Sequence, residues 1–251
     1  MRVYAIGDIH GHLDKLRSVH ALIAADKARV GDPDAVVVHV GDLVDRGPES
    51  AGVLSYLAEG LEAGQPWVIL KGNHDRMMRR FLEPDRLRDP SRPDLHWLQD
   101  NIGGRSTLES YGVDTDPARG KEAIHTDARA AVPEAHVTLL DRLVTHHHMP
   151  GLYFVHAGVR PGVGFADQVE DDLVWIREPF LSDTRDHGAL VVHGHSPVAA
   201  ATHYGNRLNI DSAAAYGGPL SAVVIEGAEL AVSLLTETGR RPLVPVQAAL
   251  G

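Results

Sequence analysis

Hydrophobic and polar positions follow the same pattern three times in the first third of the chain. Short apolar runs at residues 2–6, 36–40 and 67–70 each lead into a glycine-containing loop that carries charged or imidazole side chains. Each loop precedes a segment with helical spacing, such as the apolar face that begins at Leu13 and Leu16. A strand, a polar loop and a helix in this order are typical of a parallel α/β sheet.

The middle of the chain is less regular. Residues 83–96 are rich in proline and charge, which is typical of a surface loop. The sequence HWLQDNIGG that follows predicts a short helix closed by Gly103 or Gly104, both more typical of turns than of a phosphate-binding loop. Another helix is expected around 132–146. We expect residues 83–150 to form an insert or cap within a single domain that spans the whole chain.

Short apolar strands dominate after residue 152. They occur in the sequences LYFV, ALVV, RLNID, LSAVVIE and ELAVSLL, and the loops that end them predict a second sheet that is mixed or antiparallel. Just before them lie three consecutive histidines, His146 to His148. Adjacent side chains point in different directions, so this triplet predicts a solvated loop and not a metal site.

Composition narrows the class of protein. The 251 residues carry 24 Lys and Arg against 34 Asp and Glu, a net charge of −10, so we expect no general binding of nucleic acid. The absence of cysteine excludes disulfides and thiolate metal sites. A strand that begins at residue 2 leaves no room for a signal peptide, and no apolar run approaches the roughly 20 residues of a membrane span. We therefore expect a cytoplasmic protein without a membrane partner.

Metal-capable side chains gather where the predicted strands end. In parallel sheets these ends form one edge, where ligands bind, and oxygen and imidazole groups are ligands for divalent metals. The residues are Asp8, His10, Asp42, Asn73, His74, His156, His193 and His195. Charged residues also follow the second strand at Asp45 and Arg46, where burial is costly unless a partner compensates the charge. The sequence therefore predicts a metal site at this edge.

Five motifs occur along the chain in this order: GDIHG (7–11), GDLVDRG (41–47), GNHD (72–75), HAGV (156–159) and GHSP (194–197). They resemble the signature of the PPP-family metallophosphatases, most closely bacterial and phage serine/threonine protein phosphatases. WIRE and IDSAAAYGG extend the likeness, which runs from about residue 3 to residue 226. The resemblance implies a calcineurin-like metallophosphoesterase fold of class α/β, a central β-sandwich of two mixed sheets flanked by helices.

The resemblance also implies a role for each motif residue. His74 would be the general acid, oriented by Asp45. Arg46, Arg177 and Asn73 would bind substrate phosphate. Two divalent ions, manganese first and iron or zinc as alternatives, would be held by Asp8, His10, Asp42, Asn73, His156 and His195, with Asp42 bridging both. His193 is expected beside the site, Asp75 in a structural hydrogen bond, and Tyr216 either near the pocket or packed in a strand.

Two activities fit this signature. The first is hydrolysis of phosphoserine and phosphothreonine in proteins, or of a phosphorylated small molecule, through a hydroxide bound by two metals. The alternative is symmetrical hydrolysis of diadenosine tetraphosphate to two ADP. Asp45 favours the phosphatase, because the dinucleotide hydrolases tend to carry alanine there, and aromatic residues are only 5% of the chain. Asp75 in place of glutamate, and Pro48, favour the alternative. A catalytically inactive binding module would lack a ligand or the acid, and none is missing.

Overall fold

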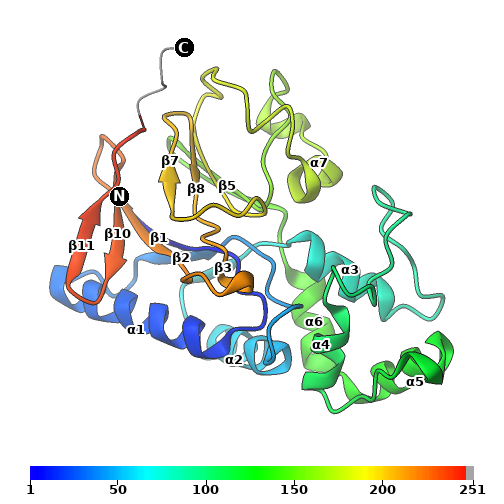
Figure 1. The fold of residues 1–251 in the computed structure, drawn as a ribbon. Coiled ribbons are helices and arrows are strands. Elements are labelled where there is room, and N and C mark those ends of the chain that lie inside the picture. Colours follow the sequence, from blue (N-terminus) through cyan, green and yellow to red (C-terminus); the bar gives the residue numbers. More distant parts are fainter. Residues whose placement is uncertain (247–251) are drawn as a thin grey trace.

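Two stacked β-sheets form the centre of the protein (Figure 1). The structure is a computed structural model, and it describes residues 1–246. The first sheet has the order β11-β10-β9-β1-β2-β3, with β1 at Arg2–Ile6, β2 at Val36–His39, β3 at Trp67–Ile69, β9 at Ala222–Glu226, β10 at Ala231–Thr236 and β11 at Gly239–Pro242. The second has the order β4-β5-β6-β8-β7, with β4 at His146–Met149, β5 at Leu152–Val155, β6 at Leu190–His193, β7 at Thr202–His203 and β8 at Arg207–Asn209.

The first sheet is parallel only in part. β1, β2 and β3 are parallel, as the repeated pattern predicts. β9 pairs with β1 in antiparallel orientation, and β10 and β11 extend that edge. The prediction that the strands LSAVVIE and ELAVSLL join the second sheet is therefore wrong. β1 is buried on both faces and needs a neighbour on each side, and the returning chain supplies one.

Alternating side chains of β1 separate the layers of the fold. Tyr4 and Ile6 face helices α1 (Leu13–Val30) and α2 (Ser50–Glu62), whereas Val3 and Ala5 face the second sheet. Phe154 of the second sheet packs in that same inter-sheet core. The outer face of the second sheet packs against α7 (Glu170–Trp175). The order helix, sheet, sheet, helix confirms the predicted sandwich.

The segment after β3 is largely helical and lies beside the two sheets (Figure 1). It contains α3 (Asn73–Phe81), α4 (Gly104–Ser110), α5 (Lys121–Ala131) and α6 (Glu134–Arg142), the last close to the helix expected around 132–146. The helix predicted over HWLQDNIGG is wrong, because turns occupy these residues and α4 begins where that helix was expected to end. Gly103 has a φ of 92°, and a Cβ there would lie 2.6 Å from the backbone nitrogen of Arg46.

The histidine triplet also differs from the prediction. It forms the edge strand β4, paired with β5, and not a loop. The rings of His146 and His148 both pack on Tyr153, while His147 packs on Phe154. Stacking on a buried aromatic strand therefore compensates for the polar character of β4. Among residues 1–246 no helix is long and apolar enough to cross a membrane.

Candidate active site

The predicted metal-ligand residues of both sheets meet at one edge of the sandwich. Asp8 and His10 follow β1, Asp42 follows β2, Asn73 and His74 begin α3, His156 follows β5, and His195 follows β6. All are at least 95% buried. The strands hold the chain rigidly up to the first polar residue, so each side chain starts from a fixed backbone position.

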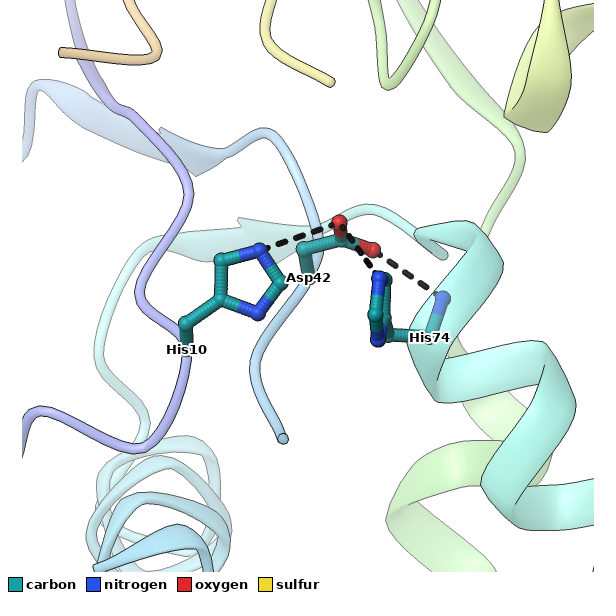
Figure 2. A group of neighbouring side chains, drawn as sticks. All are labelled: His10, Asp42 and His74. Atoms are coloured by element: carbon teal, nitrogen blue, oxygen red, sulfur yellow. Dashed lines mark hydrogen bonds and ion pairs between the residues drawn. The ribbon is translucent and has the colours of Figure 1, made fainter. Parts of the chain in front are cut away.

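Asp42 lies at the centre of this cluster (Figure 2). Its Oδ2 lies 3.4 Å from Nε2 of His10 and 4.0 Å from Nε2 of His74, and its Oδ1 lies 3.3 Å from Nε2 of His156. Two groups share Asp42, one with His10 and His74, the other with His156 and His195. Within each group the potential ligand atoms lie within 4.8 Å of one another. The geometry fits two adjacent metal ions with Asp42 between them.

The protonation of the imidazoles suits metal binding. Nδ1 of His10 donates to the carbonyl of Val44 at 2.9 Å, and Nδ1 of His156 donates to the carbonyl of Val40 at 2.8 Å. Burial lowers the pKa of both histidines, which favours the neutral form with a lone pair on Nε2. Nε2 of His156 lies 3.0 Å from Oδ1 of Asn73, two electron-rich atoms that a cation between them would bring together.

Two buried ligand atoms have no hydrogen-bond partner among residues 1–246: Oδ1 of Asp8 and Nε2 of His195. The other oxygen of Asp8, Oδ2, accepts a hydrogen bond from the backbone nitrogen of His195 at 2.9 Å. Gly194 permits this approach, since a Cβ there would lie 1.8 Å from Oδ1 of Asp8. Unsatisfied buried polar atoms are costly, and a metal ion would satisfy both.

Carboxylates accumulate around the cluster. Burial raises the pKa of Asp8, and the charges of Asp211 and Asp42 raise it further. Burial also raises the pKa of Asp211 to about 6 and that of Asp75 to about 7. Burial alone would raise the pKa of Asp42 too, but the imidazoles of His156 and other histidines lower it below its usual range. Such a concentration of buried acids is suited to binding cations.

His74 is held by a second buried acid. Nδ1 of His74 lies 2.7 Å from Oδ2 of Asp45, a residue with no exposed surface. The Asp45 carboxylate also accepts hydrogen bonds from Nε1 of Trp97 at 2.9 Å and from Oγ1 of Thr107 at 2.7 Å. The backbone nitrogen of Asp45 donates back to the same Thr107 oxygen at 2.8 Å. Asp45 is therefore fixed from three sides.

Sequence reasoning did not identify Trp97, Thr107 or Asp211 as members of the site. Trp97 and Thr107 belong to the predicted insert or cap, residues 83–150, and only the fold brings them to Asp45. Asp211 closely follows β8, as Asp8 follows β1 and Asp42 follows β2, so the strand-end rule could have found it. Within the site it accepts a hydrogen bond from the backbone nitrogen of Ala213 at 3.0 Å.

Two arginines flank the metal-ligand residues. Nη1 of Arg46 lies 2.8 Å from Nε2 of His10, and its Nη2 lies 3.1 Å from Nε2 of His74. Arg177 donates from Nη2 to the carbonyl of His195 at 3.2 Å. The Tyr216 ring, 65% exposed, lies 5.2 Å from the Arg46 guanidinium carbon, so of its two predicted environments it has the one near the pocket. Arg46 thus lies beside the group that contains His10 and His74, and Arg177 lies beside the group that contains His195.

The other two predicted neighbours lie outside the metal-ligand cluster. Nε2 of His193 lies 3.3 Å from Nη1 of Arg207. Asp75 accepts hydrogen bonds from the backbone nitrogens of Gly72 at 2.8 Å and Leu43 at 2.9 Å. These bonds join the start of α3 to the loop that carries Asp42, so Asp75 has the structural contacts expected for it.

The site's backbone is strained. Positive φ values occur at His10 (44°), Asp42 (49°), Asp45 (75°), Arg46 (70°) and His195 (65°). Each such conformation costs on the order of 1–3 kcal/mol outside glycine and persists only where surrounding contacts hold it. The strain is concentrated on residues that the sequence assigns to metal binding, acid positioning and phosphate binding.

The sandwich, the shared Asp42 and the buried imidazoles define a metal-dependent phosphoesterase. The chain belongs to the calcineurin-like phosphoesterase family, whose model matches residues 1–225. Members of this family use divalent metals, and the site described above has the ligands to hold them.

Known proteins resemble the chain over most of its length. Bis(5'-nucleosyl)-tetraphosphatase PrpE (asymmetrical) of Bacillus subtilis (strain 168) is 25% identical over 236 residues, which are 86% of this chain and 87% of that protein. The crystal structure of a candidate diadenosine tetraphosphatase superposes with a TM-score of 0.60 at 21% identity, covering 97% of this chain and 94% of that one. A cold-active protein tyrosine phosphatase superposes with a TM-score of 0.62 at 16% identity, covering 97% and 79%. These two structures share the fold.

Proposed function

We propose that the protein is a metal-dependent phosphomonoesterase that hydrolyses phosphoserine and phosphothreonine in proteins. The observation that carries this proposal is the buried pair of His74 and Asp45, with Nδ1 and Oδ2 2.7 Å apart. A serine or threonine alkoxide is a poor leaving group and needs a proton as the ester bond breaks. A histidine fixed by a carboxylate is suited to supply it.

The residues of the site divide the reaction between them. Arg46, Arg177 and Asn73 bind the phosphoryl oxygens, and the planar guanidinium groups match their geometry. As water attacks phosphorus and the bond to the alkoxide oxygen breaks, His74 donates its Nε2 proton to that oxygen. Nη2 of Arg46 lies 3.1 Å from this Nε2, so a phosphoryl group bound by Arg46 would lie beside the acid. Asp45 holds the ring and stabilises its protonated form.

Bound divalent metal ions would supply positive charge to the site of this acidic chain. Two divalent ions held by Asp8, His10, Asp42, Asn73, His156 and His195 would polarise the phosphoryl group and lower the pKa of the attacking water. Manganese is our first candidate, with iron and zinc as alternatives. The proposed substrate is a phosphoprotein in the cytoplasm.

The test compares two leaving groups. His74→Asn should reduce turnover of a phosphoserine peptide by about 100-fold or more, the usual contribution of a general acid. It should reduce turnover of p-nitrophenyl phosphate much less, because nitrophenolate leaves without a proton. Assays of both substrates with the same metal-loaded preparation make the comparison. Equal losses on the two substrates would exclude His74 as the acid.

A second candidate function has its own support. The Bacillus subtilis relative is named an asymmetrical bis(5'-nucleosyl)-tetraphosphatase. Aromatic rings also lie beside the site: Tyr216 over Arg46, and Trp175 with its ring centroid 5.9 Å from that of His195. These two rings could stack on nucleobases, so the low aromatic content of the chain argues less strongly against a dinucleotide substrate. Chromatography of the products of diadenosine tetraphosphate distinguishes asymmetrical cleavage, which gives ATP and AMP, from symmetrical cleavage, which gives two ADP.

A further inference from the structure

A cavity lies at the far end of the parallel strands from the metal-ligand cluster. This α1–α2 groove has a volume of about 940 Å³ and is bounded by α1 from Arg17 onward, by α2 from Tyr56 onward and by the beginnings of β2 and β3. In Figure 1 the two helices lie side by side along the outer face of the first sheet. None of the metal-ligand residues lines the groove, so it belongs to a separate part of the surface.

Small side chains keep the groove open. Ala21, Ala24 and Ala28 line it from α1, and Gly60 and Ala63 line it from the other side. A cavity of this volume lies within the range of about 300–1,000 Å³ found for small-molecule sites.

Aromatic rings form the floor. Tyr56 and Trp67, both partly exposed, have ring centroids 5.8 Å apart and planes inclined by 30°. The His20 ring lies 4.6 Å from Trp67 and 5.4 Å from Tyr56. Gly60 permits this arrangement, because a Cβ there would lie 1.8 Å from the Trp67 ring. The Tyr56 and Trp67 rings, with the His20 ring inclined to them by 75° and 61°, offer an aromatic surface to a ring-containing ligand.

Polar groups are few and placed at the margins. Nε2 of His20 pairs with Nε2 of His39 at 3.0 Å, while within residues 1–246 no side chain or backbone group hydrogen-bonds to Nδ1 of His20. The Arg17 guanidinium lies 6.0 Å from the Tyr56 ring and forms no ion pair within the described residues. Lys27 lines the other end, and Glu59 brings a single opposing charge.

Lys27 lies near Asp32 and Asp34, so within the described residues Arg17 is the less compensated cation of this lining, on a chain with a net charge of −10. We propose that the α1–α2 groove is a binding site for a planar aromatic molecule that carries a negative charge. The ring system of the ligand packs on Tyr56 and Trp67, and its anionic group lies near Arg17, with His20 available for a hydrogen bond. An uncharged ligand with the same rings would still pack on Tyr56 and Trp67 but would gain nothing from the charge of Arg17.

Two dyes that differ in charge test this proposal. 8-Anilinonaphthalene-1-sulfonate combines an aromatic ring system with a sulfonate, and N-phenyl-1-naphthylamine has the same rings without the charge. Fluorescence titration of the metal-loaded protein should give one saturable site for each. Arg17→Gln should weaken binding of the sulfonate about fivefold, the size of one exposed charge pair. It should change binding of the neutral dye by less than about twofold.

A matched pair of substitutions on α1 locates the site. Ala24→Leu fills the groove and should weaken binding of both dyes by at least about tenfold, whereas Ala25→Leu, one position along on the exposed side, should not. Ala28→Leu, one turn further, serves as a second filling variant. Phosphatase activity should be unchanged in each variant. A negative result in the dye-binding test would therefore leave the proposed function unaffected. Equal dye affinities in the Ala24, Ala25 and Ala28 variants, or equal losses of both dyes in Arg17→Gln, would overturn the proposal.

Discussion

At the scale of single residues, Asp42 connects the two halves of the proposed metal centre. One carboxylate oxygen faces His156 and the other faces His10 and His74. Few side chains can face two cations at once, and an amide in the same place would lose the negative charge that compensates them. In the proposed centre, the shared position of Asp42 is thus the feature on which both metal sites would depend.

Asp42→Asn should therefore remove metal from both sites and not from one alone. We expect elemental analysis of the purified variant to give well under half the metal content of the parent protein, together with loss of phosphatase activity. His148→Asn, on the exposed strand β4, is the control and should retain both. Full metal content in the Asp42 variant would contradict the bridging role.

Trp97 and Thr107 both donate hydrogen bonds to Asp45, so we expect them to act on the proposed reaction through Asp45. Hydrogen bonds to a charged group contribute about 1.5 kcal/mol or more, and 1.4 kcal/mol corresponds to a tenfold change. Thr107→Val and Trp97→Phe should each lower kcat for a phosphoserine peptide by about tenfold, with a smaller loss for p-nitrophenyl phosphate. Thr126→Val, in which a helical threonine loses only a bond to its own helix, should affect neither substrate. Equal losses for the two substrates would indicate a structural role.

At the scale of elements, a cluster of polar and charged groups connects α1 to strands β1 and β11. Asp26 of α1 accepts hydrogen bonds from Arg240 of β11 at 2.6 Å, from Tyr4 of β1 at 2.8 Å and from Arg29 at 2.7 Å. Burial alone would raise the pKa of Asp26, but the bonds from Arg240, Arg29 and Tyr4 lower it below its usual range. The ionised form is thus favoured by folding.

Asp26→Asn should lower the free energy of unfolding by about 3 kcal/mol at neutral pH, because it leaves Arg240 and the buried hydroxyl of Tyr4 without their charged partner. A depressed pKa contributes stability above the unfolded value, about 3.9, and loses it as the pH falls through the folded value. The difference between parent and variant should therefore shrink below about pH 4. Urea denaturation across pH measures it, with exposed Glu62→Gln as control. A difference independent of pH would contradict the charge-based explanation.

The sequence predicted most strands because an apolar run followed by glycine and a polar residue is a local signal. Its errors concern non-local contacts. Nothing near residues 222–236 indicates pairing with β1, the first strand of the chain, and this pairing depends on the whole fold. The histidines of β4 form a strand because they pack on Tyr153 and Phe154, which outweighs their local character.

At the scale of the whole molecule, the metal-ligand residues come from positions 8 to 195 and meet because strands of both sheets end at one edge. This rule allowed their prediction from sequence. The environment of Asp45 could not be predicted in the same way, because Trp97 and Thr107 lie 52 and 62 residues away without a strand to mark them. The segment expected to be a cap thus also supplies two groups that position the proposed acid pair.

The proposed function requires a site that acts on esters with a poor leaving group. The most direct test measures kcat/KM for phosphoserine and phosphothreonine peptides beside that for diadenosine tetraphosphate, with the same manganese-loaded preparation. Phosphate release follows the peptides, and chromatography of nucleotides follows the dinucleotide. We predict a higher kcat/KM for the peptides, because the pair of His74 and Asp45 supplies the proton that an alkoxide needs and a nucleotide leaving group does not. Efficient nucleotide formation with negligible turnover of both peptides would contradict the claim and favour the dinucleotide hydrolase.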